Sequence, residues 1–205
     1  MFLQKLRDLV NGDRDKYTLQ ELLDHFGSSS IVVALVLVTF ITSIPLPPWG
    51  GGFETIPGGI ISLILAIQGL IGVDKLYLPG FISSIMIDVS IIKNSEYMQK
   101  MFDWLEENIE PDRYEWALNL FTEKLMYILI IPNALLMILP IIFTNGPPSQ
   151  CITLMTLSWL LYDGYYFLIM LGLSICIVLF YAVFIALSTK FLYRTRKTWT
   201  FGIWK

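Results

Sequence analysis

Five polar side chains that interrupt the apolar parts of this chain are the residues whose types could support chemistry. They lie beside or between long uncharged segments, where an ionisable or amide side chain is by default a functional candidate. Carboxylate, hydroxyl and amide oxygens in such places bind ions or the polar part of a small solute or lipid-linked group. The candidate binding residues are therefore Glu54, Thr55, Gln68, Asn145 and Asp163.

Each candidate also has a purely structural interpretation. Glu54 is a solvated carboxylate if its loop is outside the membrane, and Asp163 is a solvated helix stop because Gly164 follows it. Gln68 and Asn145 can join helices by amide hydrogen bonds, which contribute roughly 0.6 to 2 kcal/mol in membranes. The two interpretations differ in whether Glu54, Asn145 and Asp163 converge on one cavity.

Catalytic chemistry has little support in the sequence. The chain has 1 His and no Asp/Glu pair beside its apolar segments, and the glycines at 50–52 are not followed by the Lys-Ser/Thr of a phosphate loop. Cys151 and Cys176 both lie in apolar stretches and have no metal-ligand spacing. We predict no catalytic residues, no metal, no cofactor and no enzyme activity.

The composition indicates that much of the chain is surrounded by a lipid bilayer and not by water. Hydrophobic residues make up 55% of the chain and charged residues 15%, and the mean hydropathy is +0.64; an average soluble domain has about 25% charged residues. No charged side chain lies between Lys124 and Asp163. The formal net charge of -3 gives no reason to expect nucleic-acid binding.

Proline and glycine break the apolar segments at corresponding places. Pro45 and Pro47 precede a run of glycines in the first half, and Pro140 and Pro148 enclose the polar break in the second, with Gly164 after it. Proline lacks an amide donor, and unpaired backbone groups are not tolerated in lipid, so each loop is either external or lines a cavity inside protein. The segments are only marginally long enough to cross a bilayer, which favours re-entrant hairpins.

These features divide the chain into six parts. Two hydrophobic hairpins are preceded by an amphipathic arm, joined by an amphipathic linker, and followed by one longer apolar helix and a basic tail. The predicted parts are the cytoplasmic arm 1–27, the first hairpin 28–73, the helical linker 74–123, the second hairpin 124–164, the transmembrane helix 165–192 and the cytoplasmic tail 193–205. The predicted fold is an all-α integral membrane protein with two pseudo-repeated broken or re-entrant hairpins.

Local signals refine two of these parts. In the arm, Thr18 and Glu21 form a capping box for a helix that Gly27 ends. In the linker, Pro111 is predicted to separate two amphipathic helices.

The basic residues after the last apolar segment predict the orientation. Lys190, Arg194, Arg196 and Lys197 form a positive-inside signal, which places the C-terminus in the cytoplasm beside anionic lipid headgroups. The arm also carries basic residues, so both ends are expected inside and the number of crossings is expected to be even.

Paired motifs resemble those of the ExoD family of bacterial exopolysaccharide-synthesis membrane proteins. The first half has Ile44-Pro45-Leu46-Pro47 and Gln68 with Gly72; the second has Leu139-Pro140-Ile141 and Asp163-Gly164; and the opening T-L-x-E-L-L-D-x-x-G lies at Thr18–Gly27. Ile142, Thr144 and Tyr162 depart from the family pattern. The linker has Glu106, Glu107, Glu110 and Asp112 where family members are strongly basic.

The resemblance implies a multi-pass protein of the bacterial cytoplasmic (inner) membrane that is needed for exopolysaccharide production. Two mechanisms remain open. Inverted internal repeats with broken helices, which we expect here, are typical of transporters, which bind solutes near the midplane. The alternative is a non-catalytic scaffold or assembly subunit that binds other membrane proteins or a second copy of itself, with dense aromatic residues as its partner surface.

Overall fold

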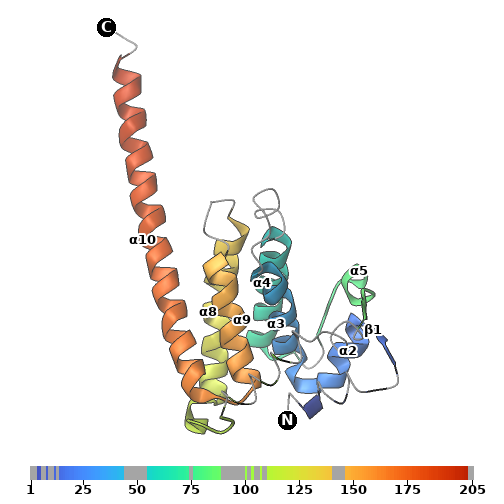
Figure 1. Ribbon diagram of the computed structural model, residues 1–205. Helices are drawn as coiled ribbons and strands as arrows, with labels where there is room; N and C mark the ends of the chain where they lie inside the picture. The colour runs from blue at the N-terminus through green and yellow to red at the C-terminus, as the bar shows by residue number, and fades with distance from the viewer. Residues whose placement is uncertain are drawn as a thin grey trace.

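The computed structural model describes residues 14–43, 55–73, 76–88, 110–139 and 146–202, with isolated positions between 4 and 12 and between 100 and 107. This part of the chain is mostly helical, as the sequence predicts. Four helices form a bundle: α3 (Ser30–Ser43), α4 (Thr55–Ile71), α8 (Leu120–Ile138) and α9 (Gly146–Leu160). A fifth helix, α10 (Gly164–Gly202), runs along one side of the bundle and far beyond its end (Figure 1).

The N-terminal helix forms as its capping box predicts. α2 (Leu19–Phe26) begins after Thr18, whose Oγ1 accepts a hydrogen bond from the Glu21 amide at 3.2 Å. The Thr18 amide in turn donates to Glu21 Oε2 at 2.9 Å. Gly27 ends α2 with a φ of 58°, and the short helix η1 (Gly27–Ser29) leads into α3. The apolar face of α2 is buried, so the arm packs onto the bundle.

One small sheet was not predicted. Strand β1 (Lys16–Thr18) pairs antiparallel with β2 (Met86–Asp88), which follows the short helix α5 (Gly80–Ser83). The pairing joins the arm to the start of the linker, and Tyr17 lies opposite Ile87. Three-residue strands give too short an alternation to be recognised in a sequence.

The two hairpins pack through two main interfaces. The contacts are most extensive between α4 and α8 and between α3 and α9. A Cβ atom at Gly59 would lie 2.9 Å from the Ala134 carbonyl oxygen, so α4 and α8 approach each other at backbone distance. Gly69, near the other end of α4, lies against the ring of Tyr127. Small residues at such crossings are typical of membrane helix packing.

The hairpins point in the same direction, which corrects the expectation of inverted repeats. The N-terminal part of α4 contacts the C-terminal part of α8, and the last turn of α3 is hydrogen-bonded to the first turn of α9 through Ser43 and Ser149. Each pair is therefore antiparallel, so α3 runs parallel to α8 and α4 to α9 (Figure 1). Any relation between the halves is a rotation about the bundle axis.

The segment before α8 also differs from the expectation. Pro111 is followed by turns and the short helix η2 (Glu115–Ala117), where a second amphipathic helix was predicted. Asp112 and Tyr114 have φ values of 69° and 56°, which no helix accommodates. Asn119 then caps α8, which begins at Leu120, ahead of the predicted boundary at 124.

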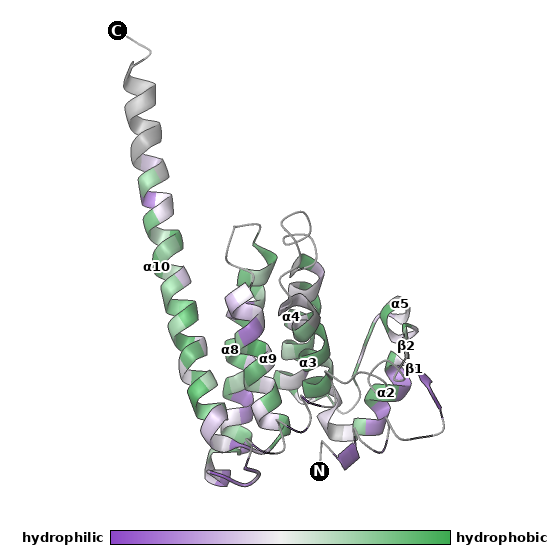
Figure 2. Ribbon diagram, viewed as in Figure 1, coloured by the Kyte–Doolittle hydropathy of each residue, from purple (hydrophilic) through white to green (hydrophobic). Residues whose placement is uncertain are grey.

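α10 is apolar and exposed over most of its length. Leu120–Ile138 and Gly164–Phe191 are the two described helices that are long and apolar enough to cross a membrane, and only 11% of the apolar window of α10 is buried. Figure 2 shows that hydrophobic residues continue along α10 past the helices of the bundle. The helix extends to Gly202, through most of the predicted tail. These features are consistent with a membrane protein.

The arm and the end of α10 lie at opposite ends of the molecule. The five long helices in the described residues alternate in direction, so α2 is at the base of the bundle and the basic residues after Lys190 are at the far end of α10 (Figure 1). The expectation of two cytoplasmic ends and an even number of crossings stays a prediction, because the structure contains no membrane.

Candidate functional site

Only part of the predicted site lies in the described residues. Glu54, Asn145, Pro45, Pro47 and Pro140 fall outside them. For Thr55, the backbone at the start of α4 is described but the side chain is not. The predicted convergence of Glu54, Asn145 and Asp163 is therefore untested.

Gln68 is engaged in a structural hydrogen-bond pair. Its Nε2 donates to the Tyr77 carbonyl oxygen at 2.9 Å, and its Oε1 accepts from the Tyr77 amide at 2.8 Å. The carbonyl of Gln68 also accepts from the amides of Gly72 and Val73, which closes the end of α4. Gln68 thus holds the segment that follows α4 against the last turn of α4. This is the structural role predicted from the sequence as the alternative to binding.

Asp163 is fully buried and forms an ion pair that the sequence did not predict. Its two carboxylate oxygens accept from Arg113, Oδ1 from Nε at 3.2 Å and Oδ2 from Nη2 at 2.7 Å. The hydrogen bonds to Asp163 raise the pKa of the Arg113 guanidinium above its usual value. Paired fork geometry of this kind is the strongest arrangement for these two groups. Asp163 is therefore not a solvated helix stop.

The same carboxylate caps α10. Asp163 Oδ1 accepts from the amides of Tyr165 at 3.1 Å and Tyr166 at 3.2 Å, the N-terminal donors that otherwise have no partner. A negative charge there also suits the helix dipole. The buried Asp163 side chain thus caps the N-terminus of α10 and binds Arg113 of the linker.

Aromatic rings and a close backbone contact complete this cluster. The Arg113 guanidinium lies 4.6 Å from the ring centroid of Tyr165 and 5.0 Å from that of Tyr166. The Gly164 amide donates to the Arg113 carbonyl oxygen at 2.8 Å, and a Cβ at Gly164 would clash with the Tyr114 carbonyl oxygen. Gly164 is therefore a close-packing residue here, whereas the sequence indicated only a residue that breaks an apolar segment.

We call Arg113, Tyr114, Asp163, Gly164, Tyr165 and Tyr166 the base cluster. Sequence reasoning missed Arg113 because it lies 50 residues from Asp163, within an acidic segment. The usable signal was chemical: an aspartate between two apolar helices needs a cation, and Arg113 is the basic residue that follows Pro111.

A second polar group lies between α3 and α9. Thr153 Oγ1 donates to Thr39 Oγ1 at 2.8 Å, and Ser43 lies within 3.4 Å of both Ser149 and Thr153. Thr39, Ser149 and Thr153 are buried. These four residues, the hydroxyl row, join the two hairpins near the ends where the undescribed loops begin. Pro148 lies in the first turn of α9, where proline is accommodated.

Two buried polar atoms among the described side chains have no hydrogen-bond partner. They are Ser62 Oγ on α4 and Asn133 Oδ1 on α8. The amide nitrogen of Asn133 donates to Ser174 Oγ of α10 at 2.8 Å and to its own helix. Asn133 thus joins α8 to α10 by the amide hydrogen bonding expected in a membrane bundle.

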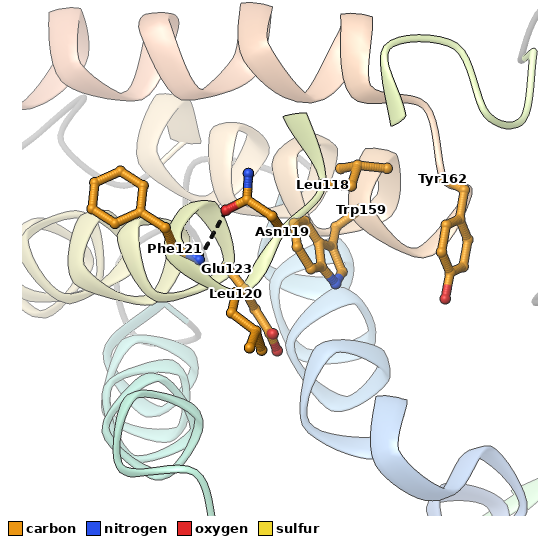
Figure 3. Close-up of a pocket in the computed structure, with 7 residues that line it drawn as sticks. All are labelled: Leu118, Asn119, Leu120, Phe121, Glu123, Trp159 and Tyr162. Carbon is orange, nitrogen blue, oxygen red and sulfur yellow. Dashed lines mark hydrogen bonds between the residues drawn. The ribbon is translucent and has the colours of Figure 1, made fainter. Parts of the chain in front are cut away.

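An open cleft of about 590 Å³ lies at the base of the bundle (Figure 3). Trp159 and Tyr162 at the end of α9 face residues from the start of α8 across it. Asn119 Oδ1 is occupied by the Phe121 amide at 2.9 Å, which leaves Glu123 as the charged group of the lining. A single carboxylate does not make an acid–base pair. The described residues also contain no group of three or more metal-ligating side chains.

The described residues form a helical bundle with a long exposed apolar helix, and polar side chains join its helices. These features define the class as an all-helical protein and are consistent with a membrane protein. The family comparison agrees. Residues 2–185 match the family model described as "Exopolysaccharide synthesis, ExoD", so the chain belongs to the ExoD family, and membership implies a role in exopolysaccharide synthesis. No curated protein and no solved structure matches the chain.

Proposed function

We propose that this protein is an integral membrane component of exopolysaccharide production, in which α10 crosses the bilayer and both hairpins enter it from one side. The exposed apolar surface of α10 is the observation that carries this proposal. At 1.5 Å per residue, α3 and α9 are about 21 and 23 Å long, less than the roughly 30 Å hydrocarbon core. Such short helices suit hairpins that turn back within the membrane.

Its molecular role is that of a non-catalytic scaffold. Gln68 and Asp163, the predicted site residues whose side chains are described, are both occupied by structural hydrogen bonds. The interface of α4 with α8 is closed at Gly59 by direct backbone contact. Rigid, internally satisfied interfaces favour holding partners in place over moving a solute between helices.

Solute movement is the second candidate, and the hydroxyl row favours it. Thr39, Ser43, Ser149 and Thr153 provide buried hydroxyls between the hairpins, adjacent to the loops that carry Glu54 and Asn145. Hydroxyl and carbonyl oxygens at the interface of two repeats are ligands that transporters use for cations.

Complementation of a deletion strain separates the two roles. The paired change Thr39→Val with Thr153→Val removes the central hydroxyl contact and nearly preserves side-chain shape. A scaffold keeps its exopolysaccharide yield at equal protein level, whereas a transporter loses most of it. Thr189→Val is the matched control, because Thr189 bonds only to carbonyls of its own helix.

Insertion depth is tested separately with a hydrophilic thiol reagent on membranes opened to both sides. In a variant lacking Cys151 and Cys176, single cysteines at positions 54 and 145 should react much more slowly than one at position 110. Equal reaction at all three positions would contradict entry of the hairpins into the bilayer.

A further inference from the structure

The part of α10 that extends beyond the bundle has no protein beside it among the described residues. Cys151 Sγ of α9 contacts the Met170 carbonyl oxygen at 3.5 Å, and Asn133 of α8 contacts Ser174, which fixes the register of α10. α9 begins at Gly146, five residues before Cys151, and α8 ends at Ile138, five residues after Asn133. The second hairpin therefore ends at about the level of α10 residues 175–179.

α10 then continues to Lys190, and none of the other described helices lies beside it there. This distance is about 17–22 Å at 1.5 Å per residue, more than half of a bilayer core. No described side chain after Tyr181 is buried. No described residue covers the exposed apolar side chains of this extension, which makes them a surface for lipid or for another protein.

We propose that a second copy of this chain packs against this extension in antiparallel orientation, α10 against α10. This inference rests on the proposed membrane location. It commits to a homodimer whose two copies have opposite orientations in the membrane.

Charge complementarity favours this occupant. The segment that contacts the start of α10 carries Glu110, Asp112 and Glu115, and Glu123 and Lys124 lie near the start of α8. Arg113 is paired with Asp163 at 2.7 Å and lies 3.9 Å from Glu110, and these residues together carry a net negative charge. Beyond Asp163 the chain has no acidic residue, and Lys190, Arg194, Arg196, Lys197 and Lys205 follow the apolar part of α10. An antiparallel pair places the basic end of each copy level with the acidic base of the other, and a parallel pair sets like charges together.

The exposed surface of α10 supplies a matching seam. Its residues alternate at spacings of four and three, the heptad pattern of helices that pack along their length. They are Ile169, Leu173, Cys176, Phe180, Val183 and Leu187, and all are exposed. Inverting one copy about the middle of this seam places Ile169 opposite Leu187 and Leu173 opposite Val183.

Basic residues on both sides of the membrane permit insertion in either orientation. Arg14, Lys16, Arg113 and Lys124 lie at the base, and Lys190, Arg194, Arg196 and Lys197 lie at the far end of α10. Orientation follows an excess of Lys and Arg on one side, and both ends of the molecule carry several of these residues.

Cysteine cross-linking in native membranes tests the antiparallel pair. Two differently tagged copies without Cys151 and Cys176 are co-expressed, one with Ile169→Cys and the other with Leu187→Cys, and treated with a short membrane-permeant bismaleimide. We expect a strong band containing both tags and no dimer when both copies carry Leu187→Cys. Leu171→Cys with Leu187→Cys is the control, because Leu171 packs against the core.

Each other outcome overturns the inference. Cross-linking of Leu187→Cys to itself indicates a parallel dimer, and no cross-link in any pair indicates that lipid covers α10. The same samples also test the proposed membrane location. If alkaline washing removes the protein from the membranes, both the membrane location and the dimer are rejected. If the protein is retained but forms no cross-links, only the dimer is rejected.

A charge exchange provides a second readout. Arg194→Glu with Arg196→Glu should reduce the cross-linked fraction several-fold, and adding Glu110→Arg with Glu115→Arg in the same chain should restore it. Recovery of the cross-linked fraction would show that the charges pair between two copies. If the basic end instead bound anionic lipid, the added basic residues at the other end of the chain would not restore the cross-link.

Discussion

Asp163 serves two structural roles that substitution can separate. It caps α10 through the amides of Tyr165 and Tyr166, and it holds Arg113 through both carboxylate oxygens. Asparagine keeps the capping oxygen and loses the charge, whereas alanine loses both.

We therefore expect Asp163→Asn and Asp163→Ala both to lower the free energy of unfolding, with alanine worse by about 1 kcal/mol, the usual contribution of an N-cap. The midpoints of thermal unfolding in detergent show which of the two variants is less stable. Equal midpoints for the two variants would show that the cap contributes nothing at this position.

Glu21 makes the arm sensitive to acid. Its hydrogen bond from the Thr18 amide lowers the pKa of the carboxyl group in the folded state. A lowered folded-state pKa stabilises the fold above the unfolded-state pKa, and this contribution is lost as the pH falls through the folded-state value.

Amide hydrogen exchange of α2 should therefore accelerate at low pH in the native protein, beyond the intrinsic effect of pH. Glu21→Gln retains a capping-box hydrogen bond but cannot titrate, so its protection should not change over the same range. Loss of protection in both proteins would assign the acid effect to another group.

At the scale of elements, the interface of α4 with α8 depends on a glycine. A Cβ at Gly59 would lie 2.9 Å from the Ala134 carbonyl oxygen and 3.0 Å from Met137 Cβ, atoms that cannot move without displacing the helix. Gly59→Ala should destabilise the protein by about 1–3 kcal/mol, the range for overpacking. Gly80→Ala is the matched control because nothing lies within 4 Å of its Cβ position, and its unfolding midpoint should not change.

The sequence predicted the elements better than their contacts. The capping box at Thr18 and the apolar runs gave α2, α3, α4, α8 and α9, because helix starts and hydrophobic runs are local signals. The Arg113–Asp163 pair and the β1–β2 sheet join residues far apart in the chain, and no local pattern encodes them. The relative direction of the two hairpins was missed for the same reason. A repeated pattern of proline and glycine breaks does not determine how the two repeats are oriented in space.

At the scale of the whole molecule, α10 determines how the protein meets the bilayer. A charge near the middle of its apolar part should prevent stable insertion, because arginine at a helix centre costs about 2.5–3.5 kcal/mol on the insertion scale. Leu179→Arg should therefore lower the fraction that remains in membranes after alkaline washing. Phe191→Arg, next to Lys190, should leave that fraction unchanged, and an equal loss in both variants would contradict a membrane-spanning α10.

The base cluster also has a consequence for biogenesis. Arg113 is synthesised 50 residues before Asp163, and the whole second hairpin lies between them. The pair can close only after α8 and α9 have both been made, so until then the growing chain carries an arginine without its carboxylate. Formation of this ion pair thus requires a complete hairpin, and a chain that stops within α9 leaves Arg113 without its buried carboxylate, with Glu110 as its neighbouring acid. A quality-control protease could distinguish this state from the finished protein.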